Sequence, residues 1–237
     1  MNVLTNLINR TLKVAIDGPA GAGKSTVSQY VANKMNLIHL DTGLMYRAVA
    51  FMVYQDKVDY VADSIKIINM LKSDKIKFKK NQEGGFNVCI NNIDYTNSLQ
   101  YVSNINKITS EIAKISEIRE YLTWWQRSIA EEYDIVMSGR DICSNVLKDI
   151  ANLKIFLTAS VQERAKRRLR QLRNLGIHRE LLDVKKEILL RDKTDSERQI
   201  NRLMIPSDAV IIDSTCDSVS KTASLIMALL ESVDKSV

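Results

Sequence analysis

The sequence predicts an α/β protein in which helices cover both faces of a doubly wound parallel sheet of five strands. Short apolar runs that end in a polar residue recur along the chain, and helical patterns separate them. A glycine-rich segment, 18–25, stands between the first apolar run and the first helical pattern. A chain of 237 residues with 45% hydrophobic content can bury one sizeable core, so we expect a single domain that spans 1–237.

Five apolar runs account for the predicted strands of the sheet. In chain order they are 12–17, 37–41, 134–138, 153–159 and 209–213. The clearest helical patterns between them are 25–35, 45–53, 115–132 and 161–175. Active sites of doubly wound sheets lie beyond the carboxyl ends of the strands. We therefore expect Asp17-Gly18, Asp41-Thr42-Gly43, Gly139-Arg140-Asp141 and Thr158-Ala159-Ser160 to share one rim.

One segment interrupts this alternation of strands and helices. Residues 75–79 and 86–90 have the alternating pattern of strands joined around Gly84-Gly85, and 93–95 is a candidate third strand. We expect 58–112 to be an insert with a small antiparallel sheet, packed as a satellite beside the α/β core.

The glycine-rich segment matches the full pattern of a phosphate-binding P-loop, G-x-x-x-x-G-K-[ST]. Its backbone N–H groups can turn toward phosphates, its lysine can reach the β and γ oxygens, and its serine hydroxyl can ligate Mg²⁺. The pattern therefore predicts ATP and Mg²⁺ as cofactors, with Ser25 as the metal ligand. The expected nucleotide-binding residues are Gly18, Pro19, Ala20, Gly21, Ala22, Gly23, Lys24, Ser25 and Thr26.

Charge and cysteine content narrow the class of protein. The 34 basic and 28 acidic residues give a net charge of +6, which suits an anionic ligand without identifying it. Cys89, Cys143 and Cys216 are too far apart for a zinc site and odd in number, so we expect three small core residues. Residues 1–10 lack a signal-peptide pattern, and no apolar run approaches the ~18 residues of a membrane span. We expect a cytoplasmic protein with no membrane contact.

Two short clusters stand where strands are predicted to end. Arg47 follows Asp41-Thr42-Gly43 in the first turns of a helix, where a guanidinium could hold a second phosphate group. The alternative is that Thr42 caps the helix and Arg47 is exposed. Arg140 and Asp141 lie side by side after a buried strand, either to address different parts of one ligand or as a surface ion pair.

Two basic stretches follow in the second half of the chain. Arg191, Asp195 and Arg198 have the i, i+4, i+7 spacing of one helical face, which suits either a polyanion with hydroxyls or an exposed helix with internal pairs. Residues 161–180 begin with an arginine-rich amphipathic helix. The absence of interleaved aromatic residues favours a mobile lid over ATP rather than a nucleic-acid surface, and a merely solvated face is the third interpretation.

Taken together and in this order, these clusters resemble the bacterial cytidylate kinases, which move the γ-phosphoryl group of ATP to CMP or dCMP. The resemblance covers nearly the whole chain. It includes the insert, which short nucleoside monophosphate kinases lack. The motifs that carry it are Ile16-Asp17-Gly18-Pro19, Leu40-Asp41-Thr42-Gly43-Leu44-Met45-Tyr46-Arg47, Ile118-Arg119-Glu120-Tyr121-Leu122 with Gln126-Arg127, Gly139-Arg140-Asp141-Ile142, Lys154-Ile155-Phe156-Leu157-Thr158-Ala159-Ser160, and Asp208-Ala209-Val210-Ile211-Ile212-Asp213-Ser214.

The resemblance implies a role for each polar residue of the rim. The residues implied to approach the CMP phosphate are Thr42, Tyr46, Arg47 and Arg140. Those implied to read cytosine are Ser110, Arg119 and Asp141, and those implied to engage sugar and phosphates are Arg191, Asp195 and Arg198. Cytosine has an exocyclic amine that needs an acceptor, and N3 and O2 atoms that need donors, which suits these residue types.

The same resemblance implies catalysis by positive charge and by positioning, with in-line transfer and no side-chain nucleophile. The charges would come from Lys24, Arg140, Arg167, Arg191 and Arg198 together with Mg²⁺. The chain departs from the family pattern at Ser138, where an acid is usual, and at Cys143-Ser144, where Gly-Thr is usual.

Other functions stay open at the level of sequence. Within the kinases, the alternative acceptors are UMP, shikimate and dephospho-coenzyme A. A nucleotide-dependent switch that binds nucleic acid is the rival from another class, although the chain lacks both N-K-x-D and an apolar strand ending in Asp-Glu. We expect ATP and CMP or dCMP as partners, no nucleic acid, a monomer, and mobility in both the lid and the insert.

Overall fold

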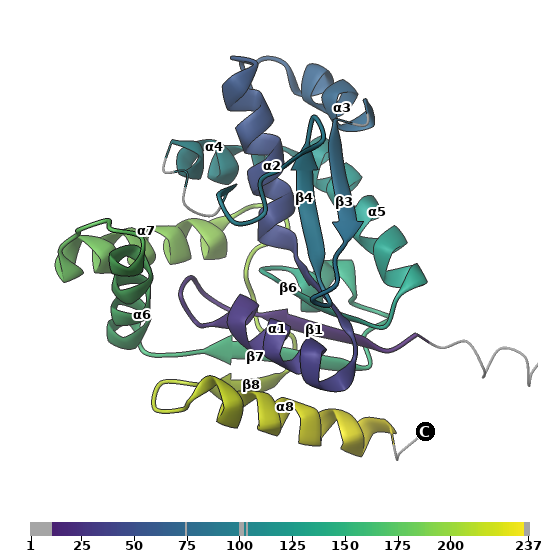
Figure 1. Cartoon of the computed structure of the whole chain (residues 1–237), viewed down its shortest axis with the longest axis vertical. Helices are drawn as coiled ribbons and strands as arrows, with labels where there is room; N and C mark the ends of the chain where they lie inside the picture. The colour runs from purple at the N-terminus through teal and green to yellow at the C-terminus, as the bar shows by residue number, and fades with distance from the viewer. Residues whose placement is uncertain (1–10, 74, 100–101, 103, 235–237) are drawn as a thin grey trace, which may run out of the picture.

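The computed structural model describes residues 11–73, 75–99, 102 and 104–234 (Figure 1). Its main sheet has five strands in the order β2-β6-β1-β7-β8, and every neighbouring pair is parallel. The strands are β1 (Lys13–Asp17), β2 (Ile38–Asp41), β6 (Ile135–Gly139), β7 (Leu153–Thr158) and β8 (Val210–Asp213). The predicted doubly wound parallel sheet is confirmed. The expectation for 1–10 and positions 74, 100, 101 and 103 of the insert lie outside the described residues.

Helices cover both faces of the main sheet. On one face, α1 (Lys24–Met35) and α8 (Val219–Asp234) pack against each other and over β1, β6 and β7. On the other lie α2 (Thr42–Gln55), α5 (Ser116–Glu132) and a π-helical turn, Ile142–Val146. The alternation along β1 decides this division, because Val14 and Ile16 join one apolar cluster and Ala15 joins the other.

The insert has its own sheet but not its own core. It comprises α3 (Ser64–Lys72), the antiparallel strands β3 (Ile76–Lys80), β4 (Phe86–Ile90) and β5 (Ile93–Asp94), and α4 (Ile105–Ile112). The predicted antiparallel sheet is confirmed. The expected satellite packing is not, because Val88 and Ile90 belong to the same buried cluster as Leu40 and Met137 of the main sheet. Phe78 of β3 also packs edge-on against Trp125 of α5, with ring centroids 4.9 Å apart.

The predicted lid segment, 161–180, forms a helix and its connection to the next helix, and the two helices cross beside the carboxyl ends of β7 and β1 (Figure 1). We call this pair of helices the lid. α6 (Val161–Asn174) begins after Ser160, whose hydroxyl accepts a hydrogen bond from the Glu163 N–H. It packs on α7 (Leu181–Glu197) through a small cluster of apolar side chains. This cluster comprises Ala165, Leu169, Leu172, Val184 and Ile188. The predicted apolar stripe of the basic helix therefore faces α7.

Two further sequence expectations, on Cys216 and Arg198, differ from the structure. Cys89 and Cys143 are buried as expected, but Cys216 is exposed, because it follows β8 in the turn before α8. Arg198 does not continue the helical face of Arg191 and Asp195, since α7 ends at Glu197 and Arg198 has an extended backbone (φ −56°, ψ 139°). Within the described residues, no helix is long and apolar enough to cross a membrane.

Candidate functional site

The parallel register brings the polar ends of the strands to one edge of the sheet. Asp17 of β1 lies opposite Gly139 of β6, and Asp41 of β2 lies opposite Ser138. Thr158 of β7 lies opposite Asp213 of β8. The four predicted rim segments therefore do share one rim.

The P-loop connects β1 to the amino-terminal end of α1. Gly18 has a φ of 151°, and a Cβ built there would meet the Leu157 carbonyl oxygen at 1.9 Å, so only glycine fits beside β7. Gly23 has a φ of 92° at the start of α1, and no side chain caps the helix there. The first N–H groups of α1 are thus left for an anion, and the helix dipole favours one.

Lys24 is held inside this loop. Its ammonium donates to the carbonyl oxygens of Gly18 at 2.7 Å and Pro19 at 2.9 Å, and the residue is buried. Burial first and the charges of Arg140 and Arg191 next lower the pKa of Lys24 well below its usual value, while Asp41 and Asp17 oppose the shift. An arriving polyanion would stabilise this charged ammonium more than it stabilises an exposed lysine.

Ser25 and Asp41 form the part of the site suited to Mg²⁺. The Ser25 hydroxyl donates to Asp41 Oδ2 at 2.5 Å, so two hard oxygen atoms meet at the start of α1 and the end of β2. Mg²⁺ is usually held by one or two protein oxygens, with phosphates and waters completing its octahedron, and this donor pair fits that requirement. The sequence indicated Ser25 for this role but not Asp41.

A cluster of arginines surrounds Asp195 on α7. Arg140 Nε lies 2.7 Å from Asp195 Oδ2, Arg198 pairs with the other oxygen, and Arg191 Nε lies 4.0 Å away. Burial alone would raise the pKa of Asp195, but Arg140, Arg198 and Arg191 hold it below its usual value. Three guanidinium groups around one carboxylate leave a net positive site, which is suited to a phosphate group. The structure brings Arg191, Asp195 and Arg198 together as expected, although not on one helical face, and adds Arg140 to them.

Arg119 and Asp141 form a second, deeply buried ion pair. Arg119 Nη2 lies 2.7 Å from Asp141 Oδ2, and the side chains are only 2% and 8% exposed. The Tyr46 ring lies under the Arg119 guanidinium at 5.5 Å, and burial raises the pKa of Tyr46. Asn145 Nδ2 also donates to Asp141 Oδ2, at 3.1 Å. The structure thus brings together Tyr46, Arg119 and Asp141, with Asn145 as a partner that the sequence did not indicate.

Ser110, the third residue implied to read cytosine, does not join this pair. Its hydroxyl donates to the Asn106 carbonyl oxygen at 3.2 Å, within its own helix α4. Serine hydroxyls commonly bond to the preceding turn in this way, so Ser110 would have to change partner to reach a ligand.

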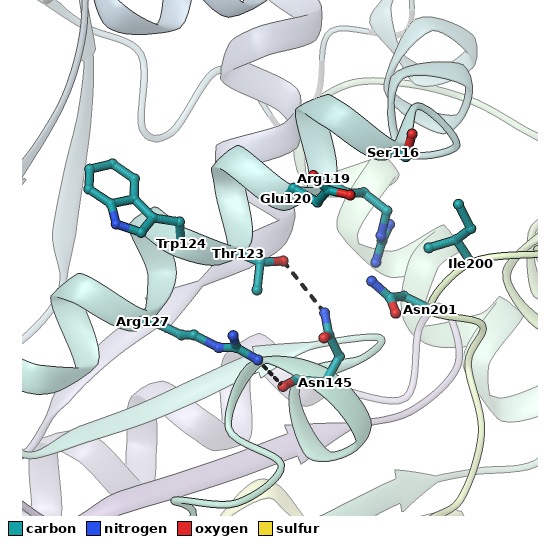
Figure 2. Close-up of a pocket in the computed structure, with 9 residues that line it drawn as sticks. All are labelled: Ser116, Arg119, Glu120, Thr123, Trp124, Arg127, Asn145, Ile200 and Asn201. Atoms are coloured by element: carbon teal, nitrogen blue, oxygen red, sulfur yellow. Dashed lines mark hydrogen bonds between the residues drawn. The ribbon is translucent and has the colours of Figure 1, made fainter.

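A cavity of about 450 Å³ opens beside Arg119, and Figure 2 shows the guanidinium pointing into it from α5. Thr123 and Asn145 line it as well, and Asn201 contributes from the segment after α7. The Nε atom of Arg119 is buried and has no hydrogen-bond partner among the described residues. A buried donor of this kind is costly unless a ligand or water accepts from it.

Thr42 and Arg47 are held by the protein itself. The Thr42 hydroxyl donates to the Ser138 carbonyl oxygen at 3.0 Å, and the helix is capped by Asp41, whose side chain accepts from the Gly43 N–H. The capping interpretation of Thr42 is therefore wrong. Arg47 is buried rather than exposed, and it donates to the Leu99 carbonyl oxygen at 3.3 Å and to Asn106 Oδ1 at 3.0 Å. Both partners belong to the insert.

The lid is tied to the P-loop by charged side chains. Arg167 donates to Ser214 Oγ at 3.0 Å and to the Ala22 carbonyl oxygen at 3.3 Å. Arg164 is buried and pairs with Asp192 at 2.5 Å, and Asp192 accepts from the Ala20 N–H at 3.0 Å. Arg167 thus lies at the P-loop as predicted, whereas no sequence pattern indicated the contacts of Arg164 and Asp192.

Asp17 lies at the rim, as predicted, but no sequence pattern indicated what its carboxylate contacts. Its carboxylate accepts from the N–H groups of Ile142 at 3.0 Å and Cys143 at 2.8 Å, which fixes the turn that follows Asp141. Burial first, and the charge of Asp141 next, raise the pKa of Asp17 to about 6. Asp17 therefore holds the turn beside Asp141 in place.

Comparisons with known proteins agree with this geometry. A family model described as "Cytidylate kinase" matches residues 14–232. The cytidylate kinase of Alkaliphilus oremlandii is 40% identical over 222 residues, which cover 94% of this chain and 99% of that protein. The cytidylate kinase of Lactobacillus johnsonii is 37% identical over 228 residues, with 96% and 97% covered. Among solved structures, an uncharacterized protein from Eubacterium ventriosum aligns at 14% identity with a TM-score of 0.51 over 94% of this chain and 99% of its own, which supports the fold alone.

Proposed function

Because this chain belongs to the cytidylate kinase family, we propose that it transfers the γ-phosphoryl group of ATP to CMP or dCMP, giving ADP and CDP or dCDP. The observation that carries the proposal is the buried Arg119–Asp141 pair at the same rim as the P-loop and the Asp195 arginine cluster. The transfer needs a site for the cytosine base, a site for the acceptor phosphate and a loop that binds the triphosphate of ATP, and these three features would supply them.

The P-loop would hold the β- and γ-phosphates of ATP. Lys24 would exchange its two carbonyl partners for phosphate oxygens, and the free N–H groups at the start of α1 would donate to the same phosphates. Ser25 and Asp41 would hold Mg²⁺, directly or through its waters. When bound, Mg²⁺ supplies positive charge that offsets the negative charge of the transferring group.

The acceptor nucleotide would lie between the arginine cluster around Asp195, which faces its phosphate, and the Arg119–Asp141 pair, which faces its base. Arg140, Arg191 and Arg198 would hold the CMP phosphate and the incoming charge, with Asp195 keeping these three side chains oriented and available to the sugar hydroxyls. Arg47 and Thr42 border the same rim. For cytosine, Asp141 would accept from the exocyclic amine, while Arg119 would donate to N3 and O2.

Catalysis would then come from position and charge rather than from a side-chain nucleophile. The acceptor phosphate oxygen attacks in line with the leaving ADP, and the loose transition state spreads charge over its equatorial oxygens. Lys24 from the P-loop and Arg167 from the lid are on the donor side of that group. Closure of α6 and α7 would exclude water and so limit wasteful ATP hydrolysis.

The internal pairs of the lid do not favour a nucleic-acid surface. Arg164 and Arg167 point toward the P-loop and β8 rather than outward. We therefore propose ATP and CMP or dCMP as the partners, and no nucleic acid. A cytoplasmic location and a monomeric state are further parts of the proposal.

An acceptor panel with ATP and Mg²⁺ tests the proposal. CMP and dCMP should be phosphorylated, and UMP should be poorer by roughly tenfold or more, because a uracil carbonyl oxygen would face the Asp141 carboxylate. Shikimate and dephospho-coenzyme A should not react. Turnover that needs DNA or RNA, or that prefers one of these other acceptors, would reject the assignment.

A further inference from the structure

A buried chain of hydrogen bonds connects the insert to the rim of the main sheet. His39 lies on β2, two residues before Asp41, and is buried. Its Nδ1 atom is 3.1 Å from Gln29 Oε1 on α1, and its Nε2 atom is 3.1 Å from Ser138 Oγ at the end of β6. Gln29 continues the chain, because its Nε2 donates to the Glu83 carbonyl oxygen of the insert at 3.0 Å.

The donors and acceptors of this chain can be assigned from chemistry. Gln29 uses its amide group as a donor to Glu83 and to Asn33, so its oxygen is the acceptor that faces His39. Burial lowers the pKa of His39, against an opposing effect of Asp41, and so favours the neutral ring. His39 therefore donates a hydrogen bond from Nδ1 to Gln29 Oε1 and accepts one at Nε2 from the Ser138 hydroxyl.

The backbone makes the same connection. The His39 N–H donates to the Gly84 carbonyl oxygen at 2.8 Å, and His39 forms an isolated parallel bridge with Gly85. Gly84 has a φ of 74°, and a Cβ there would lie 3.3 Å from Asn33 Oδ1, so the turn of the insert approaches α1 closely. The insert turn is thus fixed to β2 by both its backbone and the side chain of His39.

Beyond this point the core and the insert are not in full contact. A cavity of about 290 Å³ separates them, lined by Ser25 and Asp41 on one side and by Asn81 and Phe86 on the other. The polar chain therefore defines the spacing between the insert and the nucleotide side of the rim.

This spacing bears on the acceptor site, because the insert also holds Arg47 through Leu99 and Asn106. At its other end the series of hydrogen bonds reaches the hydroxyl of Ser138, which stands two residues before Arg140 in the sequence. We propose that His39 is a positioning residue that, through Gln29 and Ser138, docks the insert and so sets the acceptor-side arginines. The inference rests on the proposed function for its kinetic consequence, but not for its structural one.

The test compares His39→Ala with His39→Gln, which keeps one donor and one acceptor. In His39→Ala, hydrogen exchange across 81–90 should accelerate in the free protein, and the KM for CMP should rise roughly 3- to 10-fold. The kcat and the KM for ATP should change less than about twofold, which separates positioning from general damage. His39→Gln should restore most of both losses.

Two further variants keep the test decisive. Ser138→Ala should raise the KM for CMP in the wild-type background and add little in the His39→Ala background, because the two residues act through one chain. It also replaces His39→Ala if that protein does not fold. Asn87→Ala is the matched control, because it removes hydrogen bonds to Asn81 and Asp94 inside the insert only.

The results separate this inference from the proposed function. Faster exchange across 81–90 in His39→Ala, with no CMP kinase activity in any variant, would support the docking role and reject the function. Wild-type exchange and a wild-type KM for CMP in His39→Ala would overturn the inference while leaving the function intact. Equal effects of Asn87→Ala and His39→Ala would also overturn it, because loosening of the insert alone would then explain both.

Discussion

The insert and the lid both flank the rim of the main sheet, but they are attached to it by different forces. Buried residues of the insert, such as Val88 and Ile90, belong to the same apolar cluster as Leu40 and Met137 of the main sheet. In the lid, the buried cluster around Leu169 contains only residues of α6 and α7 among those described. What ties the lid to the P-loop is charged, chiefly Arg164, Arg167 and Asp192.

The difference between apolar and charged attachment indicates which region can change its contacts when a nucleotide binds. Apolar burial depends little on the ligand, so the insert should keep its interior whether or not substrates are bound. Ion pairs at the P-loop can be exchanged for contacts with phosphates, so the lid should change its partners when ATP binds. The sequence predicted mobility for both regions, and the packing now assigns the larger response to the lid.

The largest loss of activity is expected at Lys24 of the P-loop, which belongs to neither the insert nor the lid. Lys24→Met should reduce turnover roughly 10²- to 10³-fold or more, because a buried charge aimed at phosphate oxygens is lost. Arg167→Met, the lid counterpart, should lower turnover less, because other guanidinium groups remain. Steady-state kinetics on folded variants checks both, and equal losses would contradict the distinction between a fixed loop and an exchangeable lid.

Matched substitutions of buried apolar residues test whether the insert and the lid differ in how they are packed on the main sheet. Ile90→Ala in the insert should lower the free energy of unfolding of the whole protein by about 2 to 5 kcal/mol, because it opens a cavity in the shared core. Leu169→Ala should mainly destabilise the lid and leave the main unfolding transition nearly unchanged. Urea unfolding followed by tryptophan fluorescence measures the first effect, and limited proteolysis at 161–180 measures the second. A global loss of the same size in both proteins would show that the lid is part of the main core.

Asp141→Ala tests the proposed reading of cytosine by a residue that belongs to neither region, since Asp141 follows β6 of the main sheet. The kcat/KM for CMP should fall roughly 10- to 150-fold, because a charge-assisted hydrogen bond to the exocyclic amine is lost. UMP should lose less or improve, because the repulsion of its carbonyl oxygen is lost as well. Equal losses for the two acceptors would assign Asp141 to general support of the site.

The smallest expected effect is the pH dependence of stability that comes from Asp17, and its sign follows from the direction of the pKa shift. The raised pKa of about 6 means that the folded protein binds a proton more readily than the unfolded chain between about pH 4 and 6. The contribution of Asp17 to stability is therefore larger at low pH and is lost as the pH rises through 6. From pH 7 to pH 5 its contribution to the free energy of unfolding should grow by about 1.4 kcal/mol.

Asp17→Asn isolates this contribution from those of the other carboxyl groups. As the pH falls from 7 to 5, the free energy of unfolding of the wild type should increase relative to that of the variant. A difference that is constant with pH would contradict the raised pKa.

The fold could be predicted from sequence because its signals are local. Buried parallel strands are continuous apolar runs, and the P-loop is a single contiguous pattern with a strand before it and a helix after it. The shared core of the insert could not be predicted in this way. Alternation along 75–79 and 86–90 shows which side of each strand is apolar but not what covers that side.

The same limit applies to the site. The resemblance indicated Asp195 and its arginines, and the structure brings them together. Nothing local indicated that Asp192 reaches the Ala20 N–H, because 172 positions separate the two residues. Ser110 shows the converse case, since the resemblance named it but its hydroxyl is engaged within α4.

Hydrogen exchange with and without substrates compares the two regions most directly. Upon joint binding of a non-hydrolysable ATP analogue and CMP, amides of α6 and of the connection to α7 should become markedly more protected. Amides of β3 and β4 should be protected already in the free protein and should change little. Strong new protection in β3 and β4, with none in α6, would contradict the account of a core-bound insert and an exchangeable lid.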